Sequence, residues 1–117
     1  RQLGRQLRYI EQSLNSQISP LNAEIQSVET RFQTQTISNY EALYKKSQLK
    51  ARQAEMVAAA MEEKLSLLEG ASYLTLDDIG ADIERVRKRR DEAKKKQEEY
   101  QAVLQELTAN VDVFRDL

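Results

Sequence analysis

The sequence predicts an all-α protein built around an antiparallel coiled-coil helical hairpin, formed by residues of about 38–68 and 77–117. Three observations support this prediction. Apolar residues recur at alternating spacings of three and four over both stretches, which is the heptad pattern of coiled-coil helices. The 117 residues include only three glycines and one proline, which leaves little material for turns between short elements. Charged residues make up 32% of the chain, as in long solvated helices.

Residues 1–33 are expected to form an N-terminal helix with an apolar stripe along one side. Pro20 lies within this stretch, and a proline inside a helix removes one backbone hydrogen bond and forces a kink. Alternatively, Ser19 caps a new helix that begins at Pro20, so the helix is either kinked or broken near Pro20. We predict that the stripe is the partner-binding surface, formed by Leu7, Ile10, Leu14, Ile18, Leu21, Ile25 and Val28.

A break is expected at residues 34–37, where the stripe of the first helix loses its register. If the chain reverses direction here, the first helix folds back and the three helices form a bundle. If the chain continues, the first helix projects beyond the hairpin, and its exposed stripe must dimerise or bind a partner. The Gln-Thr sequence of this stretch lacks the glycine that a tight turn between helices often uses. We therefore favour the projecting helix.

The hairpin, residues 38–117, contains its own start and stop signals. Ser38 and Glu41 have the spacing of a capping box at the start of its first helix. Gly70 follows the last periodic residues, where a helix commonly ends, and the turn is placed at 69–76. Thr75 is a suitable N-cap for the second helix. The predicted core of the hairpin consists of Ile37, Tyr40, Tyr44, Ala51, Ala54, Ala58, Met61, Leu65, Leu68, Leu76, Ile79, Ile83, Val86, Ala93, Tyr100, Leu104 and Leu107.

The two repeats also predict how the hairpin helices pair. In the register that matches residue types best, Leu68 faces Leu76 and Tyr44 faces Tyr100. Glutamates flank the core positions of the first hairpin helix, and basic residues flank those of the second. Opposite charges therefore face each other across the interface. Arg90 occupies a core position, where a charge is costly unless its head group reaches water or an acid. We expect it to extend past the facing alanines into water, or alternatively to pair with a carboxylate of another helix.

The residue types argue against catalysis. The chain has no histidine and no cysteine, which removes most metal sites and the nucleophile–base arrangements of acyl transfer. Its glycines are isolated, so no glycine-rich phosphate loop is present. Asp77, Asp78 and Asp82 lack the spacing of a calcium loop and are interpreted as carboxylates that stabilise a helix start. We expect no enzyme activity, no catalytic or metal-binding residues, no cofactor and no small-molecule substrate.

The basic run from Arg87 to Arg90 is the other candidate binding site. Clustered bases can bind the phosphates of nucleic acid or of a membrane surface. However, acids lie at helical spacing from the neighbouring bases, as in Asp91 and Lys95, and no aromatic residues are interleaved for base stacking. The net charge of −1 adds no overall attraction to anions. We interpret the run as a solvated helix face and do not expect nucleic acid or membrane as the partner.

These features predict a structural coiled-coil interaction or oligomerisation module of a larger scaffold, tether or assembly protein. The expected partner is a second copy, giving a homodimer, or helical segments of other proteins. One alternative is a monomeric three-helix spacer, because the length and helix count are similar to a spectrin repeat. The tryptophan expected in the first helix of such a repeat is absent. The other alternative is a basic helix that binds nucleic acid or anionic lipid.

Three absences in the sequence bear on location. There is no cysteine, no apolar run approaches the ~18 residues of a membrane span, and no signal-peptide pattern opens the chain. We expect an intracellular location, cytoplasmic or nuclear. Because the first residue is Arg1 rather than methionine, we also expect a fragment cut from a larger protein, although processing would leave the same start.

Overall fold

The computed structural model describes residues 2–71 and 77–110 of the chain. These residues form three α-helices, α1 (Gln2–Gln33), α2 (Asn39–Gly70) and α3 (Asp77–Ala109). The described residues contain no β-strand. The predicted all-α class is therefore confirmed.

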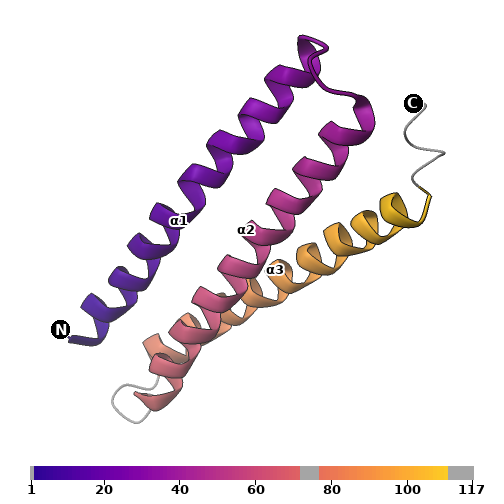
Figure 1. Ribbon diagram of the computed structural model, residues 1–117. Coiled ribbons are helices and arrows are strands. Elements are labelled where there is room, and N and C mark those ends of the chain that lie inside the picture. Colours follow the sequence, from indigo (N-terminus) through magenta and orange to yellow (C-terminus); the bar gives the residue numbers. More distant parts are fainter. Residues whose placement is uncertain (1, 72–76, 111–117) are drawn as a thin grey trace.

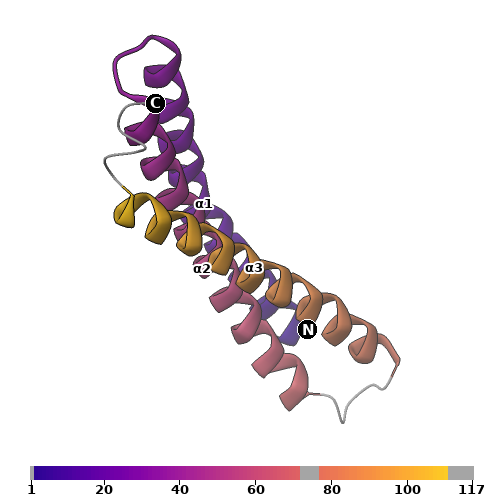
Figure 2. The same cartoon turned by 90° about the vertical axis from the view of Figure 1, so that its right-hand side faces the viewer.

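The helices form an open layer with α2 in the middle. Figure 1 and Figure 2 show α1 and α3 on two sides of α2, both running antiparallel to it, and α3 crosses α2 obliquely. Among the described residues, no Cα atom of α1 lies within 8 Å of one in α3. The Cα extents are 59 × 24 × 15 Å. Because packed helices lie about 8–10 Å apart, this thickness fits a layer better than a closed three-helix bundle.

The chain reverses direction between α1 and α2, so the projecting helix that we favoured is wrong. The reversal uses Gln35, whose φ of 60° lies in the left-handed region that glycine usually occupies. The Thr36 N–H donates to the Arg31 carbonyl at 2.8 Å, and the Gln35 N–H donates to the Phe32 carbonyl at 3.0 Å. These two bonds form a Schellman motif, which ends α1 without a glycine.

Helix α1 is continuous through Pro20, so a helix broken at this residue is also wrong. Pro20 is exposed. The missing N–H therefore leaves a carbonyl one turn earlier on the solvent side, where water can satisfy it.

The start of α2 follows the capping signal in the sequence. The Ser38 hydroxyl accepts a hydrogen bond from the Glu41 N–H at 3.1 Å, as expected for an N-cap. At the other end, α2 continues through Gly70 and the described chain stops at Ala71. Most of the predicted turn at 69–76, including Thr75 and Leu76, lies outside the described residues, as do residues 111–117 of the predicted second hairpin helix.

Small residues on α2 allow both neighbouring helices to approach it closely. Ala42, Ala51, Ala54 and Ala58 are all buried. Met61 is fully buried, with 0% of its surface exposed. At the end of the layer near residue 71, a cluster joins all three helices. It consists of Leu68, Ala71 and Ile79, with the partly buried Leu3, Leu7, Ile83 and Val86 packed against it.

The pairing of α2 with α3 differs from the predicted register. That register places Tyr44 opposite Tyr100. In the structure, Tyr44 stacks on Tyr40 of its own helix, with ring centroids 6.0 Å apart. The Tyr100 ring instead lies beneath the Lys50 ammonium, 5.9 Å from the ring centroid. The α2 residue beside Tyr100 is therefore six positions from the predicted one, which is close to the seven residues of a heptad. A shift by a whole heptad keeps core positions facing each other.

Candidate functional site

The apolar stripe of α1, predicted as the partner-binding surface, is used within the chain. Ile10, Leu14, Leu21 and Val28 are buried. Leu7, Ile18 and Ile25 are half-buried. Polar contacts on the flank fix this packing: the Gln53 side-chain amide donates to Asn22 at 2.6 Å, and Lys46 pairs with Glu29 at 3.0 Å. In this structure α2 covers the stripe, which leaves little of it for a partner.

The predicted hairpin core is divided between buried and half-buried positions. On α2, Ala51, Ala54, Ala58, Met61, Leu65 and Leu68 are buried, whereas Tyr40 and Tyr44 are half-buried. Ile37, which precedes α2, is also half-buried. On α3, only Ile79, Ala93 and Leu107 are buried among the described residues, and Ile83, Val86, Tyr100 and Leu104 are half-buried. The core is therefore better covered on α2, which has a neighbour on each side.

One cluster of charges connects all three helices. Glu11 of α1 accepts hydrogen bonds from Arg89 of α3, at 2.9 and 3.4 Å, and from Lys64 of α2. The Arg89 hydrogen bond and then the Lys64 hydrogen bond lower the pKa of Glu11 to about 2, and partial burial opposes them. Lys64 is a buried residue that the sequence analysis did not identify. Once α1 is known to fold back on α2, its position opposite Glu11 would identify it.

Several bases of α3 form ion pairs with acids of the same chain. Arg90 pairs with Glu62 of α2 at 3.6 Å and with Asp91 at 3.0 Å, so the carboxylate of another helix does reach it. Lys94 also pairs with Glu62, at 3.1 Å, and Arg87 pairs with Glu69 at 3.4 Å. The basic run thus helps to attach α3 to α2.

A cleft of about 410 Å³ separates α1 from α3 above α2. Its floor includes Ala54 and Val57, and its walls include Ile18 of α1 and Tyr100 of α3. Lys50 extends into it over the Tyr100 ring.

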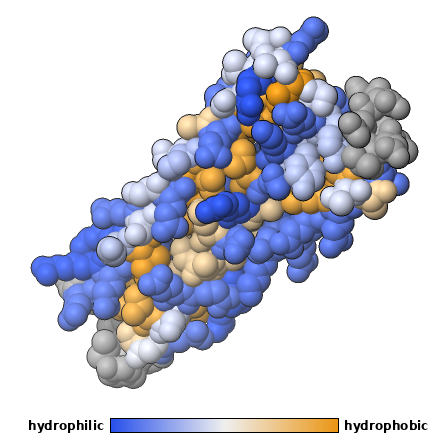
Figure 3. Space-filling model, in the orientation of Figure 1, coloured by the Kyte–Doolittle hydropathy of each residue, from blue (hydrophilic) through white to orange (hydrophobic). Residues whose placement is uncertain are grey.

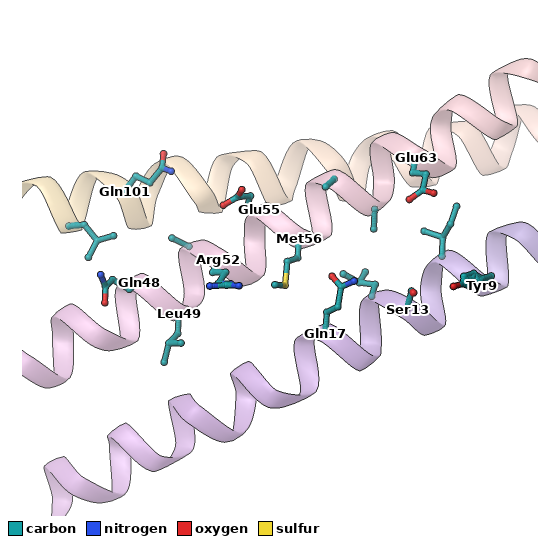
Figure 4. Close-up of a pocket in the computed structure, with 16 residues that line it drawn as sticks. Tyr9, Ser13, Gln17, Gln48, Leu49, Arg52, Glu55, Met56, Glu63 and Gln101 are labelled. Atoms are coloured by element: carbon teal, nitrogen blue, oxygen red, sulfur yellow. The ribbon is translucent and has the colours of Figure 1, made fainter.

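The opposite side of α2 borders a second, larger groove. We call this side of α2 the open face and define it by Leu49, Arg52, Met56, Ala59 and Glu63. The groove has a volume of about 920 Å³ and extends to Tyr9 of α1 and Leu104 of α3. Figure 3 shows a band of apolar residues along this side of the molecule, bordered by hydrophilic ones. Figure 4 shows Leu49, Met56 and Arg52 projecting from α2 toward the side of α1.

The chemistry of these surfaces is that of packing and charge pairing. Among the described residues, no group of three or more acids is placed to hold a metal ion. No described helix is long and apolar enough to cross a membrane. The exposed side chains near the groove include Tyr9, with 64% of its surface accessible.

No protein-family model matches this chain, and the comparisons with curated proteins and with solved structures found no similar protein.

Proposed function

We propose that this chain is a structural helical module that associates with a second copy or with helical segments of partner proteins, within a scaffold, tether or assembly protein. Coiled-coil packing of α2 against α3 and the return of α1 would give the module its rigidity. The association surface would be the open face of α2, in place of the α1 stripe that α2 covers.

The observation that carries this proposal is the unequal use of α2. Two of its sides pack against α1 and α3, and four of its alanines are buried. The open face still carries Leu49, Met56 and Ala59 beside a groove of about 920 Å³. An apolar band on a helix that already has two neighbours is typical of a surface that receives another helix.

The test is the solution mass, measured by light scattering over a concentration series. We expect the mass to rise from one chain, 13.5 kDa, toward twice that value. Met56→Lys places a positive charge in the middle of the open face and should keep the mass at one chain. Ala102→Lys, on an exposed position of α3, is the matched control and should associate like the wild type. A wild-type mass of one chain at every concentration would contradict self-association.

A monomeric spacer is the second candidate, supported by the path of the chain. α1 begins at the end of the layer where α3 also begins, and α3 ends toward the opposite end (Figure 1). Units in which the chain enters at one end and leaves toward the other can be joined end to end into an extended spacer. A strictly monomeric wild type would favour this candidate.

Binding of nucleic acid or anionic lipid by α3 has less support. Ion pairs with acids of the same chain already engage Arg87, Arg89, Arg90 and Lys94. A ligand phosphate would have to compete with these carboxylates, which lowers the gain from each contact.

A further inference from the structure

The open face of α2 carries a third heptad stripe, distinct from those that meet α1 and α3. Its residues are separated by four, three, four, three and four positions along the helix. None of them is buried. This spacing is that of a coiled-coil seam, although the seam has no partner helix within the described residues. The stripe consists of Lys45, Leu49, Arg52, Met56, Ala59 and Glu63.

The spacing of the stripe is the same in both directions along the helix. When two copies lie antiparallel, each stripe residue of one copy therefore lies opposite a stripe residue of the other. Leu49 of one copy then lies opposite Ala59 of the other, and a large side chain meets a small one. Arg52 lies opposite Met56, and its methylene groups can pack on the thioether. At 1.5 Å per residue, the seam is about 27 Å long.

The charges of the open face agree with the same antiparallel pairing. Basic residues lie toward its N-terminal end, and acidic residues lie toward its C-terminal end. Antiparallel pairing places Lys45 opposite Glu63, and Arg52 beside Glu55, in both halves of the interface. Among the described residues, Arg52, Glu55 and Glu63 form no ion pair. Lys45 has only an exposed contact with Glu41, at 3.8 Å.

We propose that a second copy of this chain binds the open face, with the two α2 helices antiparallel about a two-fold axis between Arg52 and Met56. This inference rests on the proposed function and names its partner and geometry. A two-fold axis makes each contact occur twice, which is the usual symmetry of a homodimer. Parallel pairing would place Lys45 against Lys45 and Glu63 against Glu63, so the charges favour the antiparallel form.

The test uses two charge-reversed variants, alone and mixed. The acidic variant is Lys45→Glu with Arg52→Glu, and the basic variant is Glu55→Lys with Glu63→Lys. Each variant alone brings like charges together across the seam, so its self-association constant should fall roughly tenfold or more. An equimolar mixture should restore dimers, because every charged contact is then between opposite signs. Sedimentation gives the masses, and circular dichroism confirms that each variant is helical.

A matched control separates the seam from general attraction between oppositely charged proteins. Lys88→Glu with Lys95→Glu changes two exposed bases of α3 and shifts the net charge from −1 to −5, as the acidic variant does. It should dimerise alone like the wild type. Its mixed dimer with the basic variant should be weaker than that of the acidic variant with the basic variant, because only half of its charged contacts are then between opposite signs.

Each outcome has a distinct meaning. Restored dimers in the mixture, with weak association of each variant alone, support the antiparallel seam. If both variants associate as strongly as the wild type, the inference is overturned but the proposed function stands, because another surface is used. If the variants stay monomeric even when mixed, the register is wrong. A wild type that is monomeric at every concentration overturns both the inference and the proposed self-association.

Discussion

The two interfaces of α2 differ in what they bury. Against α1, α2 covers the large side chains Ile10, Leu14, Leu21 and Val28. Against α3, the buried described residues of the third helix are only Ile79, Ala93 and Leu107. The α3 side relies more on exposed charge pairs, such as Lys94 with Glu62. Yet α3 has the more regular heptad repeat in the sequence, and the α1 stripe is the irregular one.

This contrast teaches that the regularity of a heptad does not measure how well a seam is packed. The α3 repeat places Arg90 and Gln97 at core positions, where little apolar area can be buried. The α1 stripe places four branched aliphatic residues in the α1–α2 interface, where all four are buried. Each buried aliphatic side chain removes apolar area from water, which a charged or amide side chain does not.

The largest expected effect is the loss of stability when a leucine in the α1–α2 interface is shortened, compared with the same change in the α2–α3 interface. Leu14→Ala removes a side chain that is 4% exposed and leaves a cavity between α1 and α2. We expect the free energy of unfolding to fall by about 2–5 kcal/mol in a denaturant titration. Leu104→Ala makes the same change at a half-buried position of α3 and should cost about 1 kcal/mol. Equal losses for the two variants would show that the interfaces are equally packed.

The charge cluster at Glu11 should give a smaller, pH-dependent difference. Its pKa is lowered from 4.5 to about 2, so its stabilising contribution is complete above about pH 4.5 and is lost as the pH falls toward 2. Because the ion pairs are partly exposed, we expect Glu11→Gln to cost only about 1 kcal/mol at pH 7. Urea titrations from pH 7 to pH 2 would measure the difference between the two proteins.

That difference should shrink toward zero at the acid end of the range. Glu24→Gln removes an exposed carboxylate of α1 that has no ion pair among the described residues, and it should change stability by no more than a few tenths of a kcal/mol. A constant difference between wild type and Glu11→Gln at every pH would mean that ionisation of Glu11 does not stabilise the fold.

The smallest expected effect is at the turn that brings α1 back to α2. Gln35 has a positive φ, which costs a residue with a side chain roughly 1 kcal/mol relative to glycine. We expect Gln35→Gly to raise the melting temperature and to add about 0.5–1 kcal/mol of stability. Gln33→Gly, inside the last turn of α1, should instead destabilise by a similar amount. A destabilised Gln35→Gly variant would argue against the observed turn.

The sequence predicts the helices well because their signals are local. Ser38 identifies the start of α2, and the heptads identify which sides of α2 and α3 pack. It does not predict the direction of α1, because the reversal depends on Gln35 adopting a conformation that composition alone does not suggest. It also does not fix the register of α3, because shifting a heptad by its full period keeps apolar residues facing each other. The burial of Lys64 was also not predicted, because its partner Glu11 is 53 residues away in the sequence.

The open face was likewise not identified, because its stripe is only partly apolar. Arg52 and Glu63 interrupt it, so that it resembles an ordinary solvated face until the other two sides of α2 are assigned. Removing the positions that α1 and α3 cover makes the remaining repeat visible. A helix can carry more than one seam, and the weakest is the hardest to recognise in the sequence.

The central claim, that α1 folds back along α2, is tested most directly by one distance. The chain has no cysteine, so Gln6→Cys and Ser66→Cys provide two unique, exposed sites for spin labels. Dilution with unlabelled chains keeps the measured distance within one molecule. Because packed helices lie about 8–10 Å apart, the folded-back arrangement predicts a distance within about 20–25 Å by pulsed electron resonance. A projecting α1 would separate the labels by about 90 Å, at 1.5 Å per residue, and that result would contradict the account.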